Sequence, residues 1–436
     1  MPAKKLLAIT LTSLSIAAVA APTAKTAPKT KKQTSAAKAQ RAQKADGSNS
    51  TPAEIKEQIA LLKARLAKMD NNAGEPKAHF NWQKYVSVTG LVNMDASYYS
   101  KPYFGAGNRE TTSSSFLDLG TANLAASAHF GHWVSGRVSL LSQNGQSPAV
   151  RNADPYLDAN HHVKVDQAFI TVANFAQTPY FVRVGQQYAP FGRYQRYPLT
   201  NTLTQSLSQT DAPIAQLGFV TDAGFYGSAY ALSGEHKYGD SNSTNIKNGG
   251  FNIGIQRLVK QMSFDIGMSY IANMADVDSI RSLIETQGGY RNRVPGVGGY
   301  LNVYAGPFEF GAQVISATQR FSSLQYAYQE SSGNLVGAKP SAGDVNAEYS
   351  FKTAGHNSQA QVSFQWTSQA HNSATGVNAT DPTVLPKKRI SVSYGVNLMK
   401  HLATSVQLYR DYDYKANHGG TNNHDNVAML RLSLMM

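Results

Sequence analysis

The sequence predicts an all-β fold, an antiparallel transmembrane β-barrel of about 16 strands that follows a short α-helix. Three observations lead to this prediction. Apolar and polar residues alternate along most of the chain after residue 84, an export signal stands at its start, and its 436 residues include no cysteine. Alternation with a period of two gives each strand one face for lipid and one for water.

The first residues match a secretory signal. Lys4 and Lys5 precede an apolar run over 6–17, and Ala18-Val19-Ala20 fits a cleavage site. We therefore expect residues 1–20 to be a cleaved signal peptide. The run is too short for a membrane anchor, and no later segment approaches the ~20 continuous apolar residues of a spanning helix.

A linker and a short helix are expected next. Residues 21–50 are rich in Ala, Lys, Thr and Ser without an aromatic residue, which predicts a disordered basic linker. Residues 51–72 are expected to form a short coiled-coil helix, because Thr51-Pro52-Ala53-Glu54 matches a capping box. The apolar seam of this helix consists of Ile55, Ile59, Leu62, Leu66 and Met69. Packing on the periplasmic end of the barrel and pairing between copies are both open.

The net charge of +13 is concentrated in this extension. Residues 1–75 hold 13 Lys or Arg against 5 Asp or Glu, so the rest of the chain is only mildly basic. Binding of nucleic acid is not expected of an exported chain. A solvated tether explains the basic arm better than a binding surface does.

The barrel is expected over 84–436. The last strand illustrates the pattern, because Ala428, Leu430, Leu432, Leu434 and Met436 are apolar and half of the residues between them are polar. Fifteen strands are clear, joined alternately by short turns and by long polar stretches. The alternation breaks once near residue 220, and a strand over 214–220 restores it. The total is then sixteen, with both ends periplasmic.

A soluble β-sandwich is the alternative fold. It does not explain why short and long connections alternate, or why Tyr98, Phe130, Trp133 and Trp366 stand near strand ends. Sixteen strands leave an aqueous lumen rather than a packed interior.

Seven basic residues are predicted to line the lumen and to contact a substrate. The alternation turns five of them inward, namely Arg137, Arg183, Lys352, Arg389 and Arg431, along with the carboxylates of Asp95, Asp265, Glu309 and Glu348. The other two, Arg193 and Arg196, lie in the third long connection, residues 189–212, which often folds into a porin's lumen. They would favour anions there. Contact with lipopolysaccharide phosphates or with solvent is the alternative.

Several segments carry a resemblance to a known family. Tyr180-Phe-Val-Arg-Val-Gly-Gln-Gln-Tyr-Ala-Pro-Phe-Gly192 resembles a turn of phosphate- and sugar-type porins. The order of signal, linker, short coiled coil, 86–97, 118–124 and the Pro-Phe-Gly segment resembles the LbtU-family siderophore porins. The resemblance implies uptake of a ferric siderophore, of polycarboxylate type, across a Gram-negative outer membrane. A general anion or sugar porin and a structural or adhesin barrel are the alternatives.

The chain length bears on mechanism. About 60 residues separate the cleavage site from the first strand, which is too few for the plug of an energised 22-stranded receptor. Transport would then be facilitated diffusion. The expected partners are the siderophore, the lipid bilayer, lipopolysaccharide and further copies in a homo-trimer.

No enzyme, cofactor or resident metal is expected. The chain has no Gly-x-Ser-x-Gly motif, and no helix follows the glycines of 296–299 to make a phosphate loop. His161-His162 and the segment 412–425 could offer metal ligands, but polar loops of this kind are usually solvated.

Overall fold

The computed structural model describes residues 85–101, 113–142, 163–193, 199–240, 246–259, 261–373 and 384–436. The predicted signal peptide, linker and coiled-coil seam lie outside these residues, as does Arg196.

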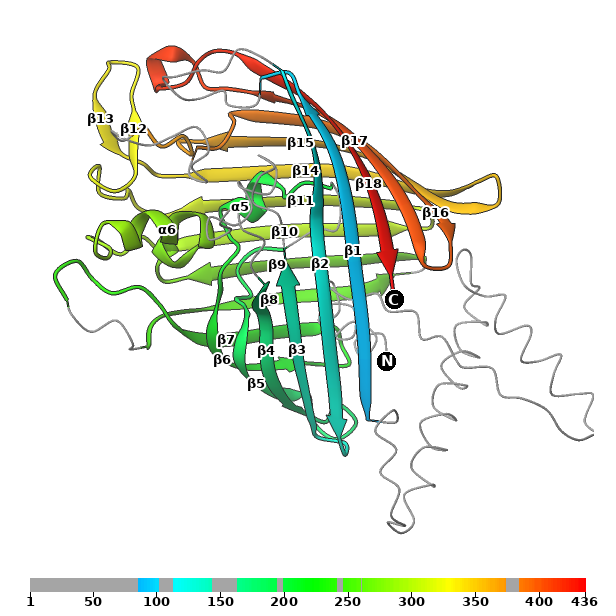
Figure 1. The fold of residues 1–436 in the computed structure, drawn as a ribbon. Coiled ribbons are helices and arrows are strands. Elements are labelled where there is room, and N and C mark those ends of the chain that lie inside the picture. Colours follow the sequence, from blue (N-terminus) through cyan, green and yellow to red (C-terminus); the bar gives the residue numbers. More distant parts are fainter. Residues whose placement is uncertain are drawn as a thin grey trace, which may run out of the picture. The chain divides into compact units, whose positions relative to one another are not determined.

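Sixteen antiparallel strands close into a barrel, as the sequence predicts (Figure 1). The strands are β1 Val86–Tyr99, β2 Ser114–Phe130, β3 Val134–Ser142, β4 Val163–Ala173, β5 Tyr180–Tyr188, β6 Asp211–Val220, β7 Phe225–Ser233, β8 Ile246–Val259, β9 Met262–Ile271, β10 Gly296–Ala305, β11 Phe308–Ala317, β14 Ser341–Thr353, β15 His356–Ser368, β16 Lys388–Met399, β17 Leu402–Tyr412 and β18 His424–Met435. Each strand pairs with its neighbours in the chain, and β1 pairs with β18, so the sheet has no free edge.

The two faces of the wall differ as the alternation predicts. On β18, Leu430, Leu432 and Leu434 are between 43% and 50% exposed, so they point away from the barrel. On the paired strand β1, Asp95 is only 4% exposed and points inward. An outer face of exposed apolar side chains around a polar interior is the arrangement that a bilayer requires of a barrel.

Short turns gather at one end of the barrel and long connections at the other. Strand β6, which contains the inferred segment 214–220, meets β7 through a short turn at 221–224. The first residues of β1 and the last of β18 lie at the short-turn end, where the sequence places the periplasm.

The long connections contain structure that the sequence did not predict. The helices α5 Leu203–Ser206 and α6 Asp278–Thr286 and the hairpin β12 Ala327–Gln329 with β13 Leu335–Gly337 form there, together with the 3-10 turns η2 Met274–Asp276 and η3 Ala416–His418. All of these elements except α6 are three or four residues long, so the sequence has too few residues in each to show a period. The nine residues of α6 do carry one, since Ile280 and Ile284 are four apart and both buried. No helix in the described parts of the chain is long and apolar enough to cross a membrane.

An apolar core at the long-loop end holds these elements together. Phe191, Leu203, Ile280, Ile284 and Tyr326 are each at most 1% exposed and belong to one cluster. The core packs the long connections on one another and on inward side chains of the wall, such as Ile315 of β11. The described connections therefore form a structured mouth rather than separate solvated loops.

Candidate pore constriction

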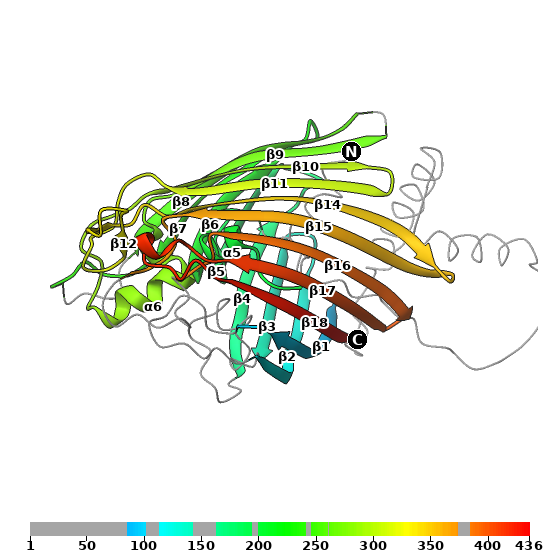
Figure 2. The ribbon, with the colours of Figure 1, turned by 90° about the horizontal axis from the view of Figure 1, so that it is seen from above.

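The described parts of the connection between β5 and β6, residues 189–193 and 199–210, lie inside the barrel (Figure 2). We call residues 189–210 the inner arm, of which 194–198 lie outside the described residues. The inner arm bonds to inward side chains of β9, β11, β15, β16, β17 and β18. Only a segment in the interior can reach the inner faces of so many strands. The arm therefore narrows the lumen, as the sequence predicts for the third long connection.

The first anchor of the arm is the ion pair between Arg193 and Asp265 of β9. Asp265 also accepts a hydrogen bond of 2.6 Å from the Tyr226 hydroxyl, and that hydroxyl contacts the Tyr300 hydroxyl. The Arg193 guanidinium lies 5.1 Å from the centre of the Tyr300 ring. The charge of Arg193 is thus neutralised by a wall carboxylate and covered by tyrosines.

The second anchor is a row of inward side chains that bonds the backbone of the arm. Gln407 of β17 accepts from Thr200 N at 3.1 Å, and Gln365 of β15 accepts from Leu203 N at 2.9 Å. The Leu199 and Asn201 carbonyls in turn accept from arginines of β18 and β16. Successive strands therefore satisfy backbone groups that a buried segment outside any sheet would leave unpaired.

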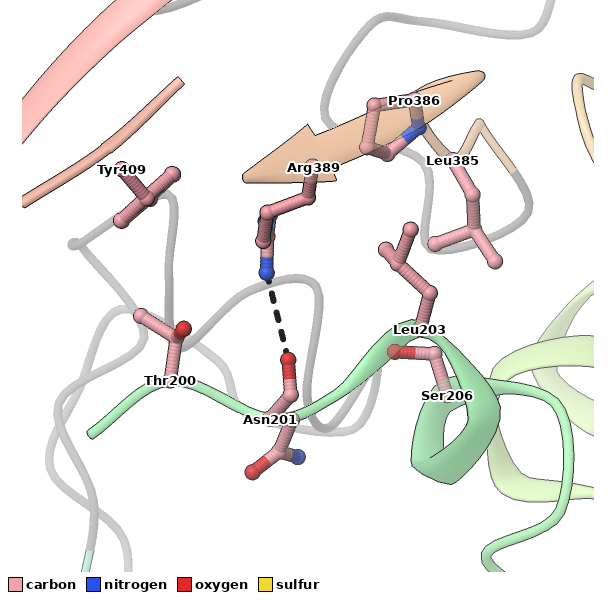
Figure 3. Close-up of a pocket in the computed structure, with 8 residues that line it drawn as sticks. All are labelled: Thr200, Asn201, Leu203, Ser206, Leu385, Pro386, Arg389 and Tyr409. Atoms are coloured by element: carbon pink, nitrogen blue, oxygen red, sulfur yellow. Dashed lines mark hydrogen bonds between the residues drawn. The ribbon is translucent and has the colours of Figure 1, made fainter. Parts of the chain in front are cut away.

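Two bidentate ion pairs hold these arginines in place. Arg389 donates to both carboxylate oxygens of Asp411 at 2.7 Å, and Arg431 does the same to Asp95. A further guanidinium nitrogen of each reaches the arm, from Arg389 to Asn201 O at 3.2 Å (Figure 3) and from Arg431 to Leu199 O at 3.4 Å. The bidentate geometry fixes each guanidinium, so the remaining N–H is aimed at the arm.

The arm is packed closely on this wall. The cavity between them in Figure 3 has a volume of about 10 Å³, which is room for about one water molecule. It is lined by residues of the arm and of the adjoining wall, namely Thr200, Asn201, Leu203, Ser206, Leu385, Pro386, Arg389 and Tyr409. No solute could pass through this gap.

The short helix α5 is held from the other side by α6. Thr202 caps α5 by accepting from Gln205 N at 3.1 Å. Ser279 of α6 donates to the Ser206 carbonyl at 2.6 Å, and Asp278 accepts from Asp211 N at 2.9 Å. The helix that the sequence did not predict therefore supports the arm.

Arg137 and Arg183 differ from Arg193 of the arm and from the two wall arginines that donate to the arm. Neither lies within ion-pair distance of a carboxylate among the described residues. Arg183 Nε donates to Thr171 Oγ1 at 3.1 Å, and its guanidinium lies 4.7 Å from the centre of the Phe169 ring. Arg137 Nη1 donates to Ser127 Oγ at 3.3 Å, while its buried Nε has no partner.

These two arginines share one part of the inner wall. Arg137 is opposite Phe169 in the β3–β4 register, and Arg183 is opposite Thr171 in the β4–β5 register. They therefore flank β4 on its inner face, in the half of each strand nearer the short turns. Lys352 lies near the same end, on β14, and is exposed.

The histidines and carboxylates that the sequence offers as metal ligands do not gather at one site in the described part of the chain. No three His, Cys, Asp or Glu side chains come together there to hold a metal ion. His418 instead contacts the Tyr328 hydroxyl at 3.0 Å, which joins two loops. His161 and His162 lie outside the described residues.

Sequence reasoning missed the glutamines that hold the arm. Gln365 and Gln407 occupy inward positions of regular strands, so the pattern gives their direction. Their partners lie 162 and 207 residues away in the chain. No local signal could have supplied that pairing.

No protein-family model matches the chain. It is 29% identical over 296 residues to a UPF0422 protein of Coxiella burnetii, covering 65% of this chain and 57% of that protein. It is 23% identical over 382 residues to a UPF0422 protein of Legionella pneumophila strain Lens, covering 83% of this chain and 65% of that protein. The chain thus spans less than two thirds of the length of either relative.

Solved structures share the fold. The anion-selective porin from Comamonas acidovorans aligns with a TM-score of 0.52 at 11% identity, over 80% of this chain and 99% of that one. The outer membrane channel DcaP of Acinetobacter baumannii aligns with a TM-score of 0.51 at 13% identity, over 80% and 97%. At such low identity the likeness concerns architecture alone, and the chain folds as a porin-like β-barrel.

Proposed function

We propose that this protein is an outer-membrane channel through which an anionic solute diffuses without a plug. A ferric siderophore of polycarboxylate type is the solute that the sequence resemblance suggests. The inner arm is the observation that carries the proposal. Buried ion pairs and a row of glutamines hold it inside a closed sixteen-stranded barrel, as a fixed constriction requires.

The inward cations that form no ion pair among the described residues are Arg137 and Arg183, which flank β4, and the exposed Lys352 of β14. Arg193, Arg389 and Arg431 are neutralised by carboxylates, so they shape the constriction rather than bind. Arg137 and Arg183 lie on the inner face and form no ion pair within 4 Å among the described residues, although the buried Asp166 carboxylate attracts the charge of Arg137. In a confined lumen such charges act more strongly on an anion than they would in bulk water.

A general, weakly anion-selective porin is the second candidate. It is favoured by the same neutralisation, since three of the predicted substrate contacts are used by the arm. A homo-trimer and contact with lipopolysaccharide remain predictions.

Planar-bilayer conductance of the refolded mature barrel tests the proposal. A ferric polycarboxylate siderophore, its iron-free form and phosphate are titrated separately. Saturable block by the ferric complex alone supports siderophore selectivity. A channel that passes all three alike supports the general porin, and a barrel without conductance contradicts both and favours a structural role.

A further inference from the structure

The outer wall carries an open groove of about 490 Å³ where β8 and β9 meet the long-loop end. Its lining includes Lys247, Gly249, Phe251, Tyr270 and Arg293. Three of its lining residues, Gly249, Gly250 and Ala272, have little or no side chain. It lies on the outside of the barrel and is separate from the lumen.

The position of the groove relative to a bilayer follows from its neighbours. Ile253, Ile266 and Met268, further along the same two strands, are about half exposed and point outward. Phe251 and Tyr270 stack at 5.4 Å at the upper limit of this apolar surface. Paired aromatic rings at the edge of an apolar belt mark the membrane interface of a barrel. The groove therefore opens at the level of outer-leaflet head groups.

The charged rim of the groove is basic. Arg293 is exposed, and it donates to Lys247 O at 3.1 Å and to Tyr290 Oη at 3.4 Å. Its Nη1 has no partner among the described residues. Lys247 pairs with Asp240 at 3.3 Å, and the exposed Lys237 lies on the adjoining loop. This rim suits an anionic head group next to the exposed Phe251 ring.

We infer that the groove binds one phosphorylated lipid of the outer leaflet. One acyl chain would lie against the Phe251 ring, and Arg293 would bind the phosphate. Guanidinium and phosphate form charge-assisted hydrogen bonds, and contact with the exposed Phe251 ring distinguishes a lipid from free phosphate. The inference does not depend on what passes through the lumen.

Native mass spectrometry of the full mature chain, released from vesicles containing a phosphorylated glycolipid, tests this inference. We expect one lipid to be retained, and Arg293→Gln to lower the retained fraction about tenfold, the effect of losing one charge-assisted contact. Arg410→Gln is the matched control. Arg410 is an exposed, outward-facing cation near the same end of the barrel, bonded to Asn426, and it does not line this groove.

Two further experiments distinguish recognition of the phosphate from binding of the acyl chain. The dephosphorylated glycolipid should be retained about tenfold less, and excess inorganic phosphate should displace little lipid. Ala272→Leu, which fills the groove, should reduce retention without touching the rim. Heat-modified gel migration confirms that each variant is folded. If Arg293→Gln does not fold, retention of the phosphorylated and the dephosphorylated lipid is compared on the wild-type chain.

Three results would overturn the inference. Equal retention of both glycolipids would remove the role of the phosphate, and equal loss in Arg410→Gln would indicate non-specific surface charge. If Ala272→Leu lost an oligomer and kept its lipid, the groove would be an interface between copies.

Discussion

At the scale of single residues, the ion pairs of the inner wall hold the inner arm in place. Asp95 is 5% exposed in its side chain and Arg431 18% exposed, so removal of either charge leaves the other with little water around it. An uncompensated charge in such a place is strongly destabilising, whereas removal of both charges costs less.

Arg431→Gln should therefore lower the free energy of unfolding by about 3 kcal/mol in urea titrations of the barrel in vesicles. Adding Asp95→Asn should restore part of that loss. Arg410→Gln, on the outer face, should change stability by less than about 0.5 kcal/mol. Additive losses in the double variant would show that the pair is not coupled.

A second residue-scale prediction concerns pH. Burial raises the pKa of Glu235 to about 7, helped by the neighbouring Glu285 carboxyl and opposed by Arg281, which lies 3.6 Å away. This folded-state value is above the ordinary value of 4.5, so the folded mouth binds the proton more tightly than the unfolded chain does. Stability is then higher at low pH and is lost as pH rises from about 4.5 to about 7.

Hydrogen exchange of α6 amides, corrected for intrinsic rates, should thus show more protection at pH 5.5 than at pH 8. Glu235→Gln should abolish that difference. A pH dependence that persists in this variant would assign it to another group.

At the scale of elements, the inner arm depends on apolar packing as well as on charge. Leu203 of α5 is 1% exposed and belongs to the core of the long-loop end. Leu203→Ala should cost about 3 kcal/mol by leaving a cavity, and the arm is the part that would loosen.

That loosening should appear as larger and noisier single-channel currents and as faster proteolysis within 189–210. Leu217→Ala is the matched control, because Leu217 of β6 is 60% exposed on the outer face. Similar noise in both variants would mean that the arm does not set the conductance.

At the scale of the whole molecule, the distribution of charge should decide ion selectivity. Arg137 and Arg183 form no ion pair among the described residues, although Asp166 attracts Arg137, whereas Arg389 and Arg431 are paired bidentately with carboxylates. Replacing both Arg137 and Arg183 by Gln should lower the anion-to-cation permeability ratio about fivefold, which corresponds to about 1 kcal/mol of ion–charge attraction across 4 Å of water.

Reversal potentials in a salt gradient measure this ratio. The paired substitution Arg389→Gln with Asp411→Asn leaves net charge unchanged, so it should alter conductance more than selectivity. If it shifted the reversal potential as far as the arginine pair did, the assignment of the free charges would be wrong.

The sequence by itself determined the wall of this protein. Strand number, turn positions and the direction of each side chain follow from a period of two and from the alternation of short and long connections, which are local properties. Thus the strand inferred at 214–220 was confirmed as part of β6. Only the tertiary structure decided what the inward residues do. Arg389 donates to the Asn201 carbonyl and Arg431 to the Leu199 carbonyl because these groups, 188 and 232 residues away in the chain, are brought to them when the barrel closes. Contacts between segments so distant have no periodic signature in the chain, since they depend on loop packing and the register of the closed sheet.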